Sequence, residues 1–145
     1  MIIEPFTGTN LIRFGASESD ATKHLGVPDK VYLNDKNACR LQYNELMMEL
    51  GFDASNESLL SKITIYNPEA ELFGRRLIGR KQKEVLQFIG KHFDVDPQLS
   101  DYGPSFSLCF KQDCTLELEF RFGILDSIRI VKTQSEDNEL ALANS

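Results

Sequence analysis

The sequence predicts an α+β fold in which two tandem helix-plus-three-strand repeats form one antiparallel sheet of about six strands, with the helices on one face. Two observations carry this prediction. Apolar and polar residues alternate with period two in several runs, which is typical of strands with one buried face. In addition, the chain repeats itself: positions recur 64 or 65 residues later, namely Gly15, Ala21, Leu25 and Gly26 as Gly79, Val85, Ile89 and Gly90, and Leu60, Ile63 and Ile65 as Leu125, Ile128 and Ile130.

A short helix is expected after residues 1–14, which read as an extended segment. Ser17 has the residue type of an N-cap, and Asp20 three positions later completes a pattern like a capping box. Gly26 is a candidate C-cap, and Pro28 prevents continuation of the helix. A helix of about two turns is marginal alone and needs a sheet to pack on.

Three strands are expected to follow this helix, over 38–43, 46–52 and 60–66. In the second run, Met48, Leu50 and Phe52 alternate with Met47 and Glu49. Asn44-Glu45 provides a turn between the first two strands, and residues 53–58 provide a longer one.

The second repeat shows the same order more clearly. A helix is expected over 81–93, because Val85, Ile89 and Phe93 form a stripe with helical spacing. A polar loop over 94–104 precedes strands expected over 106–110, 116–122 and 124–131. The predicted organisation is a first repeat over 1–67, a connector over 68–78, a second repeat over 79–133 and a flexible tail over 134–145.

The composition is that of a globular chain with an acidic balance. Its 145 residues are 41% hydrophobic and 26% charged, with a net charge of −6. An acidic protein is a poor binder of nucleic acid, because phosphate neutralisation needs clustered Lys and Arg. It suits a basic protein partner, although the same charge also serves solubility alone. With no long apolar run, no membrane partner is expected.

The three cysteines, Cys39, Cys109 and Cys114, are odd in number and lack zinc-site spacing. Cys109 and Cys114 flank a predicted turn that can bring them close. Because the chain begins without a basic region and apolar stretch, we expect a cytoplasmic protein with reduced thiols.

No catalytic motif is present, so we expect neither an enzyme nor a cofactor or metal. The two histidines, His24 and His92, lie in or near the helices without a motif around them. Glu117 and Glu119 share one face of a strand, where paired carboxylates on an open sheet favour partner contact over acid–base chemistry. A basic cluster, Arg75, Arg76, Arg80, Lys81 and Lys83, precedes and enters the second helix. A phosphate or acidic segment would relieve its repulsion from the helix dipole there, as would simple exposure to solvent.

The sheet face opposite the helices is the candidate binding surface, because the sequence supplies no further layer to cover it. Met47, Tyr66 and Tyr102 are candidate apolar anchors. Glu49, Glu117 and Glu119 are candidate partners for basic groups, and Arg121 and Arg129 can alternatively neutralise these acids across strands. The candidate partner-binding residues are Met47, Glu49, Lys62, Thr64, Tyr66, Tyr102, Glu117, Glu119, Arg121 and Arg129.

Two short motifs resemble known families. The segment from Gly15 to Pro28 resembles the opening of modules of the SmpA/OmlA and β-lactamase-inhibitor-protein-like type, and Phe120 to Ile128 is similar to a strand pattern of the same modules. The segments around Ile3 and Ile12 resemble small cytoplasmic bacterial immunity proteins. The resemblance implies tandem repeats whose concave sheet grips an enzyme.

The sequence therefore predicts a non-catalytic protein-binding module, in particular an immunity or inhibitor protein that occludes a toxin or effector. A non-inhibitory scaffold or adaptor and, less favoured, a small-ligand-binding protein remain as alternatives. The oligomeric state stays open.

Overall fold

The computed structural model describes residues 1–34, 38–53, 58–92, 98–102, 105–110 and 116–132. Its main element is an eight-stranded sheet in which every neighbouring pair is antiparallel. In spatial order the strands are β3 (Lys30–Leu33), β4 (Cys39–Tyr43), β5 (Met48–Asp53), β6 (Leu59–Ile65), β12 (Ile124–Val131), β11 (Leu116–Arg121), β10 (Ser105–Phe110) and β9 (Gln98–Tyr102). The α+β class is therefore confirmed.

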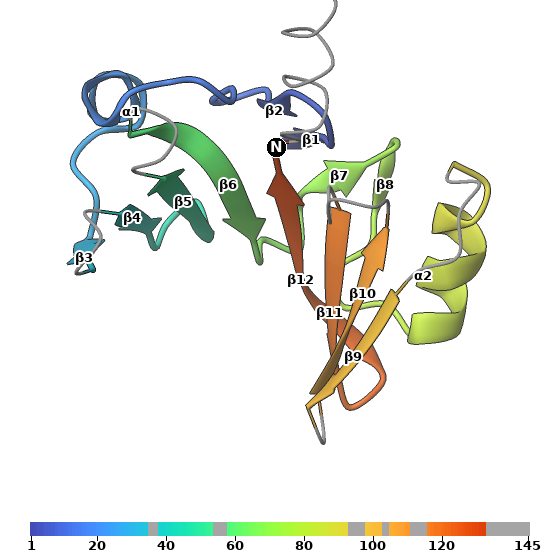
Figure 1. Cartoon of the computed structure of the whole chain (residues 1–145). Coiled ribbons are helices and arrows are strands. Elements are labelled where there is room, and N and C mark those ends of the chain that lie inside the picture. The colour runs from blue at the N-terminus through green and yellow to red at the C-terminus, as the bar shows by residue number, and fades with distance from the viewer. Residues whose placement is uncertain (35–37, 54–57, 93–97, 103–104, 111–115, 133–145) are drawn as a thin grey trace, which may run out of the picture.

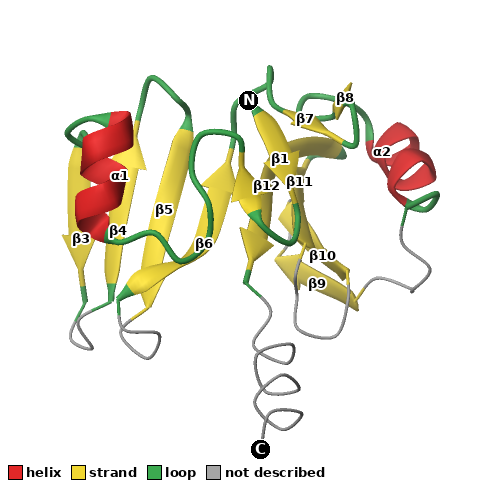
Figure 2. Cartoon of the chain, turned by 90° about the horizontal axis from the view of Figure 1, so that it is seen from above, coloured by secondary structure: helices red, strands yellow, loops and turns green. Residues whose placement is uncertain are grey.

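The sheet bends where β6 pairs with β12, so its two halves meet at an angle (Figure 1). One half follows the helix α1 (Glu18–Leu25), and the other follows α2 (Gln82–Ile89). Both helices lie on the outer side of the bend (Figures 1 and 2). The inner side carries no helix in the described part of the chain.

The prediction of about six strands was wrong, because the two edge strands carry no period-two signal. All four residues of β3 are exposed, so no alternation of burial marks that strand. β9 lies in the stretch 94–104, which was expected to be a polar loop. Pairing with one neighbour creates these strands, and an edge strand needs no buried face of its own.

A second, small sheet was also absent from the prediction. It has the order β2 (Gly8–Thr9), β1 (Ile2–Glu4), β7 (Glu71–Leu72) and β8 (Arg75–Arg76), with β1 and β7 parallel. The segment 68–78, expected to be a plain connector, supplies two of these strands. The small sheet lies on the same side as the helices (Figure 2).

The helix caps follow the sequence closely at α1 and less so at α2. Ser17 accepts a hydrogen bond from Asp20 N, and Asp20 closes the predicted capping box. Gly26 ends α1 at φ 90°, a conformation that favours glycine. The N-cap of the second helix is Lys81, whose side chain makes no capping hydrogen bond. It ends at Ile89, shorter than predicted, and Phe93 lies outside the described residues.

One continuous core joins the large sheet to the two helices and to the small sheet. Strand residues such as Leu50, Ile63 and Leu118 are fully buried, as the period-two pattern predicts. Ala21 of α1 and Val85 of α2 cover them from the two halves. The domain boundaries at 67, 78 and 133 stay a prediction, and the expected tail over 134–145 lies outside the described residues.

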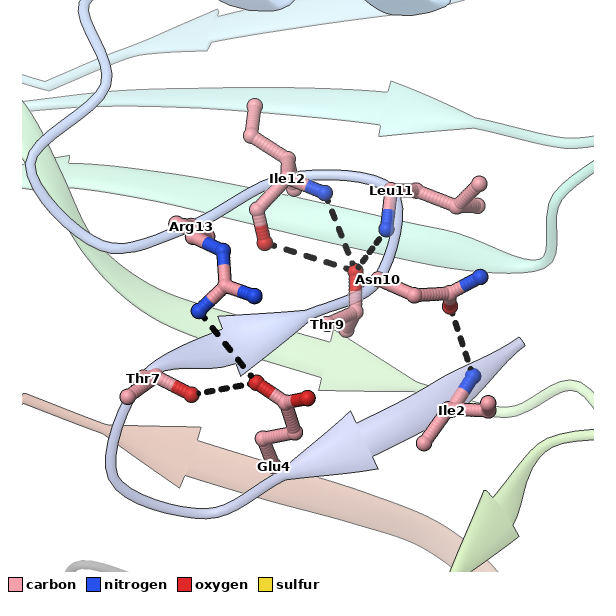
Figure 3. Close-up of polar contacts among 8 residues, drawn as sticks. All are labelled: Ile2, Glu4, Thr7, Thr9, Asn10, Leu11, Ile12 and Arg13. Carbon is pink, nitrogen blue, oxygen red and sulfur yellow. Dashed lines mark hydrogen bonds and ion pairs between the residues drawn. The ribbon is translucent and has the colours of Figure 1, made fainter.

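Thr9 organises the N-terminal segment, which packs on the large sheet on the same side as the helices (Figure 3). Its fully buried side chain accepts hydrogen bonds from Leu11 N at 3.1 Å and Ile12 N at 3.2 Å. Glu4 accepts from Thr7 at 2.6 Å and pairs with Arg13 at 3.4 Å. These contacts fold the segment so that its apolar side chains reach the core.

Candidate functional site

The open face of the large sheet, on the inner side of the bend, gathers most of the predicted binding residues. Strand register aligns one row of them across the molecule: Gln42 lies opposite Glu49, Glu49 opposite Thr64, Thr64 opposite Arg129 and Arg129 opposite Glu117. All are on the face opposite the buried row, because side chains alternate along each strand. The predicted face is thus present, centred on β5, β6 and β12.

An ion pair occupies the first part of this row. Arg40 on β4 lies 2.9 Å from Glu49 Oε1, and its guanidinium also lies 4.8 Å from the ring centre of Tyr32. The Tyr32 hydroxyl donates to Gln42 at 3.2 Å. Arg40 is thus held between an aromatic ring and a carboxylate, an arrangement that fixes its direction.

A second ion pair lies across β11 and β12, where Arg129 is 3.7 Å from Glu117. This confirms the alternative that Arg129 neutralises an acid across strands. Since Glu49 and Glu117 both have basic partners within the chain, the open face is not the acidic strip that alternation alone suggested. Its charges are mixed and largely balanced, with Lys62 exposed between the two pairs.

The face is hollowed over β4, β5 and β6, in a volume of about 940 Å³ that we call the Gly51 hollow. Glycine fits closely there, because an added Cβ on Gly51 would lie 3.2 Å from the Lys62 Cβ, a tight contact that requires a small shift of Lys62. The absence of a side chain at this point leaves a dent in the surface. The hollow is lined by residues that include Tyr32, Arg40, Glu49, Ser61, Lys62 and Arg129.

Two polar atoms along this hollow are buried without a hydrogen bond. One is Ser61 Oγ, at the irregularity where the pairing of β5 with β6 shifts. The other is Glu49 Oε1, which has the charge of Arg40 beside it but no hydrogen bond of good geometry. Buried polar atoms are normally satisfied. A bound group that carries hydrogen-bond donors can satisfy both oxygens.

A second hollow of about 560 Å³ adjoins the first, and we call it the Tyr66 hollow. Met47, Tyr66, Pro68 and Ile124 are among its lining residues, and it shares Glu49 and Thr64 with the Gly51 hollow. Burial raises the pKa of Tyr66, and the negative charge of Glu49 adds to that effect. The two hollows meet at Glu49 and Thr64, and together we call them the depression.

Met47 lies in a different element from the one predicted. It stands in the turn before β5 with φ 52°, not on the outward face of a strand. It is nevertheless 37% exposed and lines the Tyr66 hollow. Glu119 and Arg121 lie further along β11 and line neither hollow, although Glu119 is opposite Ser127, which lines the Tyr66 hollow. Tyr102 belongs to β9, but its side chain lies outside the described residues.

Three residues of the depression escaped sequence reasoning: Tyr32, Arg40 and Ser61. Tyr32 belongs to the exposed edge strand that no pattern marked. Arg40 had a signal, since it alternates with the buried Cys39 and Leu41 in a predicted strand. Ser61 had none, because the register shift that turns it toward the hollow is not visible in a sequence.

The described residues contain no cluster of three or more His, Cys, Asp or Glu that could hold a metal. His24 is exposed in α1, and His92 stacks on Phe73 with ring centres 4.1 Å apart. Cys39 is a buried free thiol, and burial, with a hydrogen bond to Glu18, raises its pKa to about 12. Such a thiol is not a nucleophile near neutral pH.

Cys109 is disulfide-bonded, so the expectation of reduced thiols throughout was wrong. The cysteine that remains in the sequence, Cys114, lies outside the described residues. The expectation failed because it rested on an assumed compartment, whereas the predicted turn after Cys109 had already indicated proximity. Among the described helices, none is long and apolar enough to cross a membrane.

Neither a protein-family model nor a curated protein matches the chain. Two solved structures share its fold. A DUF4309 family protein, YjgB, from Bacillus subtilis matches with a TM-score of 0.54 and 13% identity, over 87% of this chain and 84% of that one. An extracellular protein containing an SCP domain, from Bacillus anthracis, matches with a TM-score of 0.53 and 12% identity over 87% of this chain. The chain spans only 45% of that protein's length.

These matches overturn the resemblance to β-lactamase-inhibitor-protein-like, SmpA/OmlA-like and immunity proteins. The motifs behind it have a local structural explanation. Ser17 and Gly26 cap α1, and Gly123 occupies a tight turn with φ 77°. Residues that meet such local demands recur in unrelated proteins, and at these identities the matches establish the fold alone.

Proposed function

We propose that this protein is a non-catalytic protein-binding module that holds a partner in the depression of its open sheet face. The observation that supports this most directly is that the Gly51 and Tyr66 hollows lie on the same face and share Glu49 and Thr64. The depression offers apolar and aromatic contacts at both ends and fixed charges between them. That distribution is typical of an interface with anchor residues and a polar surround.

The ion pairs on this face support a role in binding a partner rather than simple exposure to solvent. Arg40 is held by Tyr32 and Glu49, so little side-chain entropy is lost when another protein packs against it. Lys62 is exposed and has no ion pair among the described residues. A partner that brings one acidic group to Lys62 and apolar groups to Met47 and Tyr66 would complement the depression.

A substitution at the centre tests the proposal. Thr64→Tyr retains a β-forming residue but fills the point that both hollows share. The tagged protein would be used to capture partners from its source organism, with identification by mass spectrometry. We expect one stoichiometric partner, retained by wild type and lost by Thr64→Tyr. Thr7→Tyr, on the helix side, is the matched control. Equal capture by a folded Thr64→Tyr protein refutes the proposed surface.

A charge reversal tests the outer part of the face. Glu117→Lys/Glu119→Lys is expected to abolish binding without unfolding the protein. Glu4→Lys/Glu84→Lys is its control, because it causes the same change in net charge and also breaks surface ion pairs. If both double variants bind equally, the partner does not reach β11.

Inhibition of the partner is a separate prediction. An inhibitor restores growth when it is coexpressed with a toxic partner, whereas a scaffold or adaptor binds without rescue. A small-ligand function is favoured instead if no protein is captured and a compound raises the thermal midpoint.

The tandem duplication and the location also remain proposals. The duplication is supported by the order of elements, since each helix precedes four consecutive antiparallel strands in its half of the sheet. For the location, we propose an oxidising compartment in place of the cytoplasm. The disulfide at Cys109 supports it, because structural disulfides are rare in the cytosol.

A further inference from the structure

The turn between β11 and β12 places an aromatic residue where neither conformation nor packing favours it. Phe122 has φ 53° and Gly123 has φ 77°, so both central residues are left-handed. Turns of this kind favour Asn-Gly, Asp-Gly or Gly-Gly. Phe122 also remains 78% exposed, so no burial offsets its conformational cost. An outlier of this kind points to a contact outside the folded chain.

Phe122 belongs to a patch that is apolar in its middle and basic at its rim. Ile124 is 44% exposed, and Leu86 of α2 is only partly buried. Together with Lys81 and Lys83 they line a shallow hollow of about 700 Å³ between α2 and the turn. We call Lys81, Lys83, Leu86, Phe122 and Ile124 the Phe122 surface.

The patch is held in place by the backbone. Gln82 N donates to Gly123 O at 2.9 Å, and Leu125 N donates to Arg80 O at 3.0 Å. Lys81 and Ile124 also form an isolated antiparallel bridge. The turn and the start of α2 are therefore joined by backbone contacts, and they present the apolar and basic side chains as one preformed unit.

The charge around the patch is opposite to that of the whole protein. The segment 75–83 carries five basic residues and no acidic one, in a chain of net charge −6. Arg80 pairs with Glu84 at 3.4 Å, while Lys81 and Lys83 are exposed and have no ion pair among the described residues. Basic residues beside exposed aromatic and aliphatic side chains match the boundary of an anionic bilayer.

We propose that the Phe122 surface docks the protein on an anionic lipid bilayer. Lys81 and Lys83 contact the lipid phosphates, while Phe122 and Ile124 enter the boundary between headgroups and acyl chains. Such peripheral contact needs no spanning helix. A soluble polyanion would use the lysines equally well, but it would leave the exposed Phe122 without a role. The apolar residues therefore favour a membrane.

Vesicle co-sedimentation of the full chain tests this, with phosphatidylcholine vesicles that contain or lack about 30% phosphatidylglycerol. We expect binding only to the anionic vesicles, lost at about 0.5 M salt because of screening. Lys81→Glu/Lys83→Glu should weaken it at least about tenfold, since each basic residue near the surface contributes about fivefold. Phe122→Asn should weaken it about fivefold, by removal of the apolar contact.

Phe122→Asn also separates docking from folding, because asparagine suits the left-handed turn and should leave the thermal midpoint equal or higher. Lys23→Glu/Lys30→Glu, with the same net charge as the lysine double variant, should bind as wild type does. Three results overturn the proposal. The first is no binding to anionic vesicles, and the second is undiminished binding by Phe122→Asn. The third is a short DNA duplex that displaces the protein fully from the vesicles and binds wild type and Phe122→Asn equally. The partner-capture experiment is independent of these results.

Discussion

Replacement of Thr9 by valine removes one hydroxyl from the interior of the N-terminal segment with little change of shape. The Thr9 side chain is fully buried and accepts from the backbone N–H groups of Leu11 and Ile12 (Figure 3). Valine accepts neither bond. The substitution therefore measures how much the segment that bears β1 and β2 depends on this one hydroxyl.

The magnitude follows from the burial of the two donors. Ile12 is 5% exposed, so its N–H remains buried without an acceptor, at a cost of about 1–3 kcal/mol. Leu11 is 36% exposed, and its N–H can bind water instead, at a cost of about 0.5 kcal/mol. The expected loss is about 1.5–3.5 kcal/mol of unfolding free energy, or about 5–11 °C in the thermal midpoint for a chain of this size.

Urea unfolding followed by circular dichroism measures this loss against two controls. Thr9→Ser keeps the hydroxyl and should lose only about 1 kcal/mol for one methyl group. Thr7→Val removes an exposed hydroxyl and should change stability by less than about 0.5 kcal/mol. A Thr9→Val protein as stable as wild type, or a Thr9→Ser protein that loses more, would show that the hydroxyl does not hold the segment.

Three further outcomes are expected. Unreduced, denatured protein should titrate with one thiol, that of Cys39, and reduced protein with three; three thiols without reductant would disprove the disulfide. Because the folded pKa of Cys39 is about 12 against an ordinary 9.0, the unfolded chain loses this proton first as pH rises. Stability should therefore fall between about pH 9 and 12, less so in Cys39→Ala, and an equal fall in both proteins in urea melts would contradict this. Gly8→Ala should cost about 3 kcal/mol or more, because its Cβ would lie 2.6 Å from Ile12 O at φ 130°. Gly15→Ala, with open space around it, should cost about 1 kcal/mol in the same melts.

The sequence predicts most of the sheet because one face of each inner strand is buried. The alternation of Met48, Leu50 and Phe52 with polar residues survives in the structure as an alternation of burial. The cap of α1 can be predicted equally well, since Ser17 and Asp20 act within one turn of chain. Features that depend on neighbours distant in the sequence cannot be predicted in this way. Both edge strands and the small sheet that pairs β1 with β7 belong to this second group.

The charge of the candidate site shows the same division. Alternation places Glu49 and Glu117 on the open face, and that prediction was right. Their electrostatic character depends on register, which puts Arg40 beside one and Arg129 beside the other. A face that looks acidic along single strands is therefore balanced across them. Any partner must meet paired charges and a dented surface, so shape and the exposed Lys62 matter more than a complementary basic strip.

Ile124 connects the two proposed surfaces. It lines the Tyr66 hollow on the open face and also the Phe122 surface on the helix side. A partner that reaches Ile124 from one side and a bilayer that covers it from the other compete for the same side chain. Binding free energies are reciprocal, so such a partner must weaken vesicle binding by the factor by which vesicles weaken the partner. Equal vesicle affinity with and without saturating partner would mean that the partner stays in the Gly51 hollow, and that both contacts form at once.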